Sequence, residues 1–302
     1  MSRFIRSLLI FFLALTPVLF LADFMYSKAI STLNGSNMEI WRDIIEGQAS
    51  ADIIVSGDSR VNADFSPEVI DSLTGHSVYD IGVIGQHHGI QRIRYDLYRK
   101  YNDMPVMLIQ TVDNWLLMKK VTETDRIQFL PWMWNKDYYR LAIKSEPRFF
   151  LIRSIPWFRY HSYHFTTMKK ANPIPMTRRG FDLTKRVGNF NDQISQSFFC
   201  DEKKASSFRS YISGAMSEGI KVLLVIPPFS EDMRFVPGEK QKMLDYFHSF
   251  ASEMQVPLLD YNQMFSRDSS MFSDMTHLNF DGARAFSDSL AHDILRLGLL
   301  PD

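Results

Sequence analysis

The sequence is nearly free of cysteine. Cys200 is the single cysteine among 302 residues, so no intrachain disulfide can form and a hydrophobic core must stabilise the fold. With 45% hydrophobic residues, the chain is long enough for one large domain, or for one domain with a sizeable insertion. Because Cys200 follows Phe198 and Phe199, we interpret it as a small buried residue. A thiol enzyme that uses Cys200 is a weaker alternative, since no histidine has a spacing that supports it.

The sequence also has no excess of either charge. Its 34 basic and 34 acidic residues give a formal net charge of zero. A protein that binds nucleic acid through the phosphates needs a basic excess, so we expect no nucleic-acid partner. His161 and His164 have loose metal-ligand spacing but lack nearby carboxylates or cysteines. We therefore predict no metal and no other cofactor.

One long apolar run stands near the N-terminus, where residues 7–22 carry no charge. Arg3 and Arg6 precede it, which is the arrangement that keeps an N-terminus in the cytoplasm. The run approaches the length of about 20 residues that crosses a membrane, and no small-residue cleavage site follows it. We predict an uncleaved membrane anchor over residues 1–28, with a cleaved signal peptide as the alternative. Either way, the remaining chain is expected outside the cytoplasm, periplasmic or on the outer face of the cytoplasmic membrane.

Short aliphatic runs alternate with segments of helical periodicity along the rest of the chain. Apolar residues recur at three- and four-residue steps between these runs, and the last such series extends from Ala283 to Leu297. Strands separated by helices predict an α/β fold with a parallel sheet covered on both faces. Continuous apolar runs are typical of strands buried on both sides. The predicted strands are 52–56, 77–81, 106–112, 221–226 and 256–261.

Residues 116–200 break this alternation. They hold no convincing strand and are rich in aromatic and basic residues. We interpret them as an inserted, mostly helical or irregular subdomain between the two parts of the sheet domain, 29–115 and 201–302. The aromatic residues could stack sugars, lie at the membrane interface or form the insertion's own core.

Residues with the chemistry of a nucleophile and its base follow the first strand and precede the last helix. In the segment Gly57-Asp58-Ser59-Arg60, the glycine permits a tight turn and Ser59 falls at a helix N-terminus. A serine hydroxyl needs a base to become a nucleophile. His277 can be that base, and Asp274, three residues earlier, can hold the useful tautomer. Because the carboxyl ends of parallel strands collect catalytic groups, we predict that these residues meet there.

The ends of the next two predicted strands offer donors for an oxyanion. Gly85 can turn a backbone N–H toward the site, and Asn114 offers a carboxamide. With the N–H of Ser59 they form a set of three donors. Asp113 is the alternative to Asn114, but its carboxylate would repel the oxyanion.

Two more polar positions are candidate substrate ligands. Arg60 could place a positive charge near an anionic substrate, or it could pair with nearby carboxylates. His88 and its neighbour His87 could contact the substrate, or they could be exposed loop residues. Each motif also has a structural interpretation, with Ser59 as a helix cap and His277 as a structural histidine.

Taken in order, these blocks resemble those of the SGNH (GDSL-type) hydrolases. The resemblance covers roughly residues 50–114 and 204–297 and excludes the insertion. It implies a flavodoxin-like three-layer sandwich with a five-stranded parallel sheet. It also implies catalytic roles for the residues above, with Ser59 as nucleophile, His277 and Asp274 as base and orienter, and Gly85 and Asn114 as oxyanion donors.

The sequence departs from the family pattern at two places. The third block is usually Gly-x-Asn-Asp, whereas this chain has Thr111-Val112-Asp113-Asn114, so the glycine is missing and the two polar residues are in the reverse order. The first block has Arg60 where leucine is common. The α/β-hydrolases fit less well, because Val61 stands where their Gly-x-Ser-x-Gly elbow requires the second glycine.

Together with the predicted anchor, the resemblance implies a membrane-anchored, extracytoplasmic serine esterase or O-acyltransferase that acts on acyl esters, such as acetyl esters of a cell-envelope glycan. We expect an acylated small molecule or glycan as substrate, and a membrane acyltransferase is a candidate partner. The altered third block motivates an alternative, in which the fold is catalytically inactive and binds glycan or scaffolds a partner.

Overall fold

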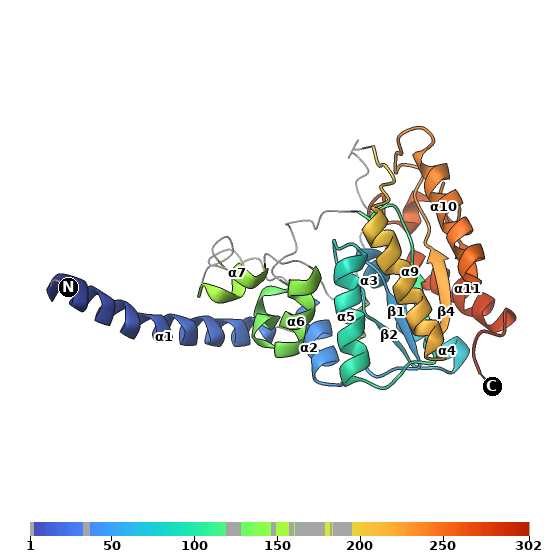
Figure 1. Ribbon diagram of the computed structural model, residues 1–302. Coiled ribbons are helices and arrows are strands. Elements are labelled where there is room, and N and C mark those ends of the chain that lie inside the picture. Colours follow the sequence, from blue (N-terminus) through green and yellow to red (C-terminus); the bar gives the residue numbers. More distant parts are fainter. Residues whose placement is uncertain are drawn as a thin grey trace.

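The computed structural model describes residues 3–32, 37–118, 128–145, 149–156, 160, 179–181, 183 and 195–301. A five-stranded parallel sheet forms its centre, with helices on both faces (Figure 1). The strand order is β2-β1-β3-β4-β5, so the chain starts inside the sheet, runs to one edge and then crosses to the other. This order is flavodoxin-like and confirms the predicted α/β sandwich.

The five strands lie within the predicted ranges. Ile53 pairs with Val78 on one side and with Met107 on the other, so the first three strands run level with one another. The loops that follow these strands therefore begin at the same edge of the sheet. The strands are β1 (Ile53–Ser56), β2 (Val78–Asp80), β3 (Met107–Thr111), β4 (Lys221–Ile226) and β5 (Leu258–Asp260).

Alternate strand residues face two separate hydrophobic cores. Ile54 and Leu108 belong to the larger core, and Val55 and Ile109 belong to the smaller one. All four side chains are fully buried, which explains the continuous apolar runs of the sequence. The larger core includes side chains of α2 (Asn37–Ile45), α5 (His88–Tyr101), α9 (Glu202–Ser217) and α10 (Glu239–Met254), and the smaller core those of α3 (Ser59–Asp64), α4 (Pro67–Thr74) and α11 (Phe280–Arg296).

The predicted C-terminal helix forms, and the last apolar position of its series is the C-cap. Helix α11 ends at Arg296, whereas the apolar series was extended to Leu297. Leu297 is the C-cap and is 42% exposed, and Gly298 follows with a φ of 61°. A left-handed glycine at this position stops the helix and turns the chain away from the core.

Helices follow β3 in the region predicted as an insertion. They are η2 (Leu130–Trp134), α6 (Lys136–Ser145) and α7 (Phe149–Ser154), and the described residues there add only an isolated bridge between Gln196 and Phe235. Their aromatic side chains share the larger core of the sheet domain, since the ring of Trp41 in α2 lies 5.4 Å from Tyr138 and 6.1 Å from Phe129. The predicted domain boundaries near residues 28, 115 and 200 stay predictions.

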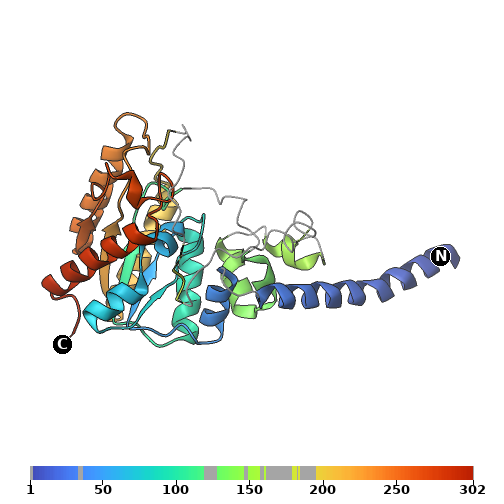
Figure 2. The same cartoon turned by 180° about the vertical axis from the view of Figure 1, so that it is seen from behind.

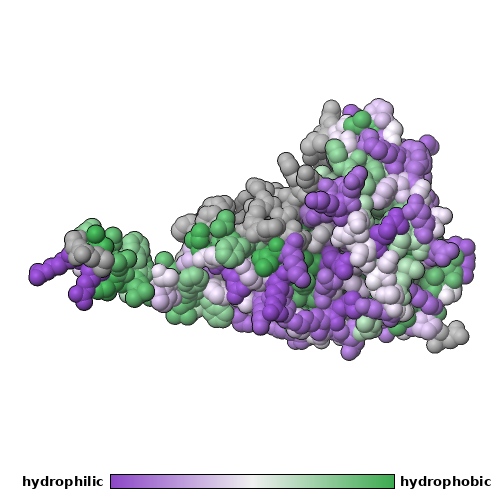
Figure 3. Space-filling view, in the orientation of Figure 1, coloured by the Kyte–Doolittle hydropathy of each residue, from purple (hydrophilic) through white to green (hydrophobic). Residues whose placement is uncertain are grey.

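Helix α1 (Arg3–Ser31) extends away from the rest of the protein (Figures 1 and 2). It is long and apolar enough to cross a membrane, and Figure 3 shows hydrophobic residues gathered along it. Near its C-terminal end, Asp23, Ser27 and Ser31 form a buried polar stripe at four-residue spacing. This polar stripe packs against the rest of the protein, and the apolar faces of α1 remain exposed.

Candidate active site

The turn after β1 brings Ser59 to the carboxyl edge of the sheet. Gly57 lies so close to β3 that a Cβ atom there would come within 1.9 Å of Thr111 Oγ1. Only glycine fits at this position, which explains why a glycine directly follows the buried strand β1. Asp58 caps α3 by accepting a hydrogen bond from the N–H of Arg60 at 3.0 Å. Ser59 is thus the first residue of α3, where its own N–H has no intrahelical acceptor.

The other half of the site is the loop between η4 (Ser269–Met271) and α11. Asp274 Oδ1 accepts hydrogen bonds from the backbone N–H groups of Thr276 at 2.7 Å and His277 at 2.9 Å. The second carboxylate oxygen of Asp274, Oδ2, lies 2.8 Å from His277 Nδ1. Asp274 therefore shapes the loop and orients the imidazole at the same time.

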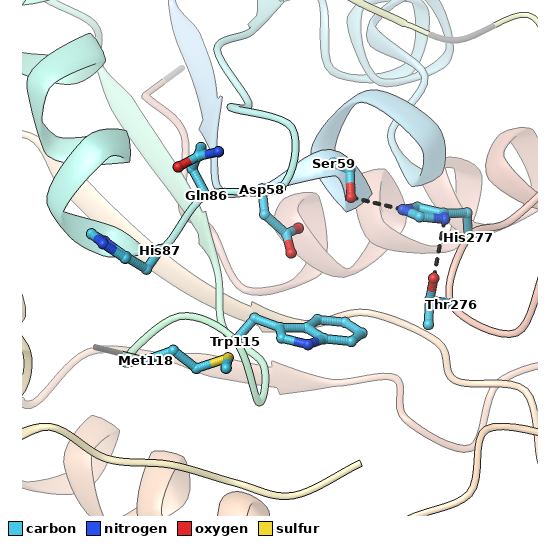
Figure 4. Close-up of a pocket in the computed structure, with 9 residues that line it drawn as sticks. Asp58, Ser59, Gln86, His87, Trp115, Met118, Thr276 and His277 are labelled. Carbon is cyan, nitrogen blue, oxygen red and sulfur yellow. Dashed lines mark hydrogen bonds between the residues drawn. The ribbon is translucent and has the colours of Figure 1, made fainter. Parts of the chain in front are cut away.

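Ser59 and His277 are hydrogen-bonded although 218 positions separate them in the chain. Ser59 Oγ lies 2.7 Å from His277 Nε2 (Figure 4). Because Nδ1 faces the carboxylate of Asp274, the proton belongs on Nδ1, and Nε2 is free to accept the serine proton. The structure thus brings together the three predicted catalytic residues in the relay that general-base catalysis needs.

The charges around His277 keep it basic. Burial alone lowers the pKa of His277, but the hydrogen bond and charge of Asp274 outweigh burial and raise this pKa above its ordinary value. Burial likewise raises the pKa of Asp274, but the hydrogen bond and charge of His277 and the hydrogen bonds from Thr276 together outweigh burial and hold this pKa well below its usual range. The pair therefore stabilises the imidazolium that forms when His277 takes the proton of Ser59.

A buried carboxylate ties the loop of His277 to the helix of Ser59. Asp64, in α3, accepts the N–H of Leu278 at 2.8 Å through one oxygen. Its other oxygen accepts from Arg60 Nε at 3.2 Å, and both side chains of this ion pair are fully buried. Burial raises the pKa of Asp64 to about 6, although the charge of Arg60 opposes that rise.

Arg60 does not reach the cavity beside Ser59, which corrects its predicted role as a substrate ligand. Its guanidinium is fully buried and lies 4.2 Å from the ring centroid of Phe229. It donates to Asp64 and to the carbonyl of Pro228. The first turn of α3 points the Arg60 side chain into the protein, while Ser59 faces the cavity. The structure therefore shows the alternative prediction, in which Arg60 pairs with a nearby carboxylate.

His88 is also misplaced by the prediction, and its neighbour takes the position at the cavity. His88 is fully buried, with Nε2 3.3 Å from Ser207 Oγ, and it packs against the ring of Phe208. His87 is buried as well, but it lines the cavity. Its Nδ1 caps α5 by accepting the N–H of Gly89 at 3.0 Å, and its Nε2 has no partner among the described residues. Burial lowers the pKa of His87 to about 4, so the ring is neutral and Nε2–H is a donor.

The cavity beside Ser59 has a volume of about 210 Å³. Trp115 and Met118 lie across it from Ser59 (Figure 4). The sequence prediction missed both, because an aromatic residue after a strand is as typical of a core as of a substrate site. The lining residues are Asp58, Ser59, Gly85, Gln86, His87, Trp115, Met118, Thr276 and His277.

Of the predicted oxyanion donors, the structure places Ser59 and Gly85 at the cavity. Gly85 has a φ of 68°, so this turn requires glycine.

Asn114 is fully buried and does not line the cavity among the described residues. Neither polar atom of its carboxamide has a hydrogen-bond partner there. Asp113 accepts the N–H of Trp115 at 2.9 Å, which occupies one of its oxygens. The oxyanion role of Asn114 stays a prediction.

Asp58 adds a neutral acid to the cavity wall. Burial, together with the nearby charge of Asp113, raises the pKa of Asp58 to about 8. The carboxyl is therefore protonated at neutral pH and places no negative charge beside the nucleophile.

Cys200 is exposed, which corrects its interpretation as a buried residue. Phe198 takes the inward position, and Phe199 and Cys200 then face solvent before α9 begins. Cys200 does not line the cavity among the described residues. Within the same residues no group of three or more His, Cys, Asp or Glu could hold a metal, and His161 and His164 lie outside them.

No family model matches the chain, and no curated protein matches it. Similar solved structures include a protein from Streptococcus pneumonia named as a candidate platelet activating factor (11% identity, 93% of this chain and 97% of that one, TM-score 0.46). They also include an acetyl xylan esterase (13% identity, 80% of this chain and 98% of that one, TM-score 0.42). A third is a candidate acylhydrolase from Bacteroides fragilis (12% identity, 82% of this chain and 88% of that one, TM-score 0.41). These likenesses are too distant to assign an activity, so function is inferred from the site geometry.

Proposed function

We propose that the protein is a membrane-anchored, extracytoplasmic serine esterase or O-acyltransferase of the SGNH type. The relay from Ser59 through His277 to Asp274 carries this proposal, with distances of 2.7 and 2.8 Å at the edge of a cavity. A protein that only binds glycan or scaffolds a partner needs neither hydrogen bond. The relay therefore favours an enzyme over the inactive alternative.

In the first half of the reaction, Ser59 Oγ attacks the acyl carbon of an ester and its proton passes to His277 Nε2. The carbonyl oxygen becomes an oxyanion, which the N–H groups of Ser59 and Gly85 can stabilise. His277 then returns the proton to the leaving alkoxide as the carbon–oxygen bond of the ester breaks. The acyl group remains on Ser59.

In the second half, a hydroxyl compound removes the acyl group from Ser59. His277 takes a proton from this compound as its oxygen attacks the acyl carbon, and Ser59 leaves with that proton. Water makes the protein a hydrolase, and a sugar hydroxyl makes it an O-acyltransferase. In the transfer reaction, a membrane acyltransferase is the proposed partner that supplies the acyl group.

The cavity supports a short acyl group on a polar carrier. A volume of about 210 Å³ exceeds the roughly 150 Å³ of a cavity that holds benzene, so an acetyl group fits within it. Trp115 offers a flat ring for a sugar face. Both side-chain atoms of Gln86 are buried without a partner among the described residues, so they can bind hydroxyl groups. We therefore propose an acetylated glycan or similar small molecule as substrate.

A fluorophosphonate probe tests the nucleophile directly, because it phosphonylates activated serines. We expect the wild-type protein and a Cys200→Ser control to be labelled and to hydrolyse p-nitrophenyl acetate, and the Ser59→Ala variant to do neither. Equal labelling of Ser59→Ala and wild type would show that another residue is the nucleophile. Absence of labelling in both folded proteins would support the inactive, glycan-binding alternative.

A further inference from the structure

The contacts of α1 show how deep the insertion lies along the membrane anchor. If Arg6 marks the inner boundary of the bilayer, a span of about 20 residues ends near Tyr26. Phe20 is six residues before Tyr26 in the sequence, which is roughly 9 Å along a helix at 1.5 Å per residue. A residue that contacts Phe20 is therefore within the outer leaflet.

Two aromatic residues of the insertion contact α1 on this stretch. The ring of Trp134, at the end of η2, lies 6.1 Å from that of Phe20 and 5.8 Å from that of Phe24. The ring of Tyr160 lies 4.8 Å from that of Tyr26. Tryptophan and tyrosine are favoured at the membrane–water boundary, which agrees with these positions. The insertion therefore contacts α1 within the apolar layer and not only above it.

Helix α7 presents an apolar face in the same region. Phe150 and Leu151 of α7 are 58% and 56% exposed, and Ile155, which directly follows the helix, is 47% exposed. Phe149 is buried in the larger core, and Arg153 lies 4.2 Å from the ring centroid of Tyr139 in α6. These two contacts fix the orientation of the helix, so the apolar face cannot simply turn inward.

The position of α7 indicates what covers this face. Figures 1 and 2 both place α7 closer to the N-terminal end of α1 than α6 lies, and hydrophobic surface gathers there in Figure 3. The apolar face of α7 is therefore level with the apolar part of α1. Three large apolar side chains exposed together at this level are typical of a lipid contact.

We infer that α7 is a second membrane contact, with Phe150, Leu151 and Ile155 inserted among the acyl chains of the outer leaflet. A single helix lets a domain swivel about its axis, whereas a second contact fixes the orientation of the domain on the membrane. The inference depends on the anchor and not on the catalytic site, so it holds whether or not Ser59 is a nucleophile.

Depth-dependent fluorescence quenching in the full-length protein tests this inference. Leu151→Cys in a Cys200→Ser background is labelled with a nitrobenzoxadiazole dye, and the protein is reconstituted into phosphatidylcholine vesicles. Leu295→Cys is the matched control, because it is also an exposed leucine, 46% accessible, but lies on α11 at the far side of the sheet domain (Figure 1). Leu13→Cys, in the apolar part of α1, is the positive control.

We expect nitroxide groups on the lipid acyl chains to quench the dye at Leu151→Cys and Leu13→Cys, and aqueous iodide to quench it at Leu295→Cys. Ile155→Cys should behave like Leu151→Cys. Iodide quenching without nitroxide quenching at Leu151→Cys, while Leu13→Cys is quenched by nitroxide, overturns the inference. In that case the face is exposed to water and lipid does not cover it.

Discussion

His277 holds its proton at a higher pH than an ordinary histidine, because Asp274 binds the other side of the ring. The base form is lost as the pH falls through this raised pKa, so we expect the esterase rate to fall below a midpoint above 6.5. In Asp274→Asn the charge is gone, and the acid limb should move to lower pH. The rate at the optimum should fall as well, by roughly 10⁴-fold if the loss resembles that of other serine triads. A pH–rate profile of both proteins checks this, and an unmoved acid limb would contradict the role of Asp274.

Asp58 makes a prediction about stability rather than rate. In the folded protein its pKa is raised to about 8, whereas an unfolded aspartate loses its proton near pH 4. Between these values the folded state binds one proton more than the unfolded state, so Asp58 lowers stability as the pH rises through this window. Asp58→Asn keeps an oxygen to cap Arg60 and cannot ionise.

The melting temperature of Asp58→Asn relative to wild type should therefore increase from pH 4 to pH 8 and level off above that. Thermal unfolding at several pH values in one detergent measures this difference in melting temperature. The contributions of most other titrating groups are the same in both proteins and cancel in the difference. A constant difference across the window would show that Asp58 ionises normally in the folded protein.

At the scale of the elements, α3 and the loop of His277 are held together by the buried pair of Arg60 and Asp64. Arg60→Leu removes the cation and leaves Asp64 buried without its partner, which costs about 3–5 kcal/mol of unfolding free energy in comparable cases. Arg92→Leu is the matched control, since Arg92 and Asp96 have the same spacing on α5 but are partly exposed. That control should lose under about 1 kcal/mol.

Denaturant unfolding compares the two variants, and steady-state kinetics shows the catalytic effect. We expect Arg60→Leu to lower kcat more than it raises KM, because the loop that carries His277 shifts relative to Ser59. Equal losses of stability in both variants would mean that the buried pair does not connect these elements.

The elements were predictable where the sequence pattern records a local constraint. The buried strands are apolar runs, Gly57 is required by the close approach of Thr111, and the spacing of Asp274 and His277 suits one tight loop. The inward turn of Arg60 was not predictable, because it depends on Phe229 from a distant loop. The burial of His88 likewise depends on α9, which no local pattern reveals.

At the scale of the whole molecule, α1 is part of the folded structure as well as the proposed membrane anchor. Its C-terminal end packs on the insertion, and Ser27 Oγ lies 2.8 Å from the hydroxyl of Tyr160. Cleavage of a signal peptide near Ala22 would remove the Phe20 contact with Trp134. We therefore predict that the mature protein keeps α1 and fractionates with membranes, which intact-mass measurement of the purified protein checks. A mature chain that begins after Ala22 would contradict this.

The packing of the insertion against α1 could not be predicted from the sequence. Trp134 contacts Phe20 and Phe24 from more than a hundred residues away, and an aromatic-rich segment is equally typical of a core, a sugar site or a membrane interface. The sheet domain, in contrast, followed from the order of its strands and helices. Figures 1 and 2 show the strands running across the direction of α1.

The most direct test of the central claim is to trap the acyl-enzyme. Wild-type protein is incubated briefly with p-nitrophenyl acetate, quenched in acid, digested and analysed by mass spectrometry. An acetyl group on the side chain of Ser59, absent from Ser59→Ala and greatly reduced in His277→Ala, is the predicted result. Acetate released with turnover but never found on Ser59, or found on another residue that Ser59→Ala leaves unchanged, would contradict the account.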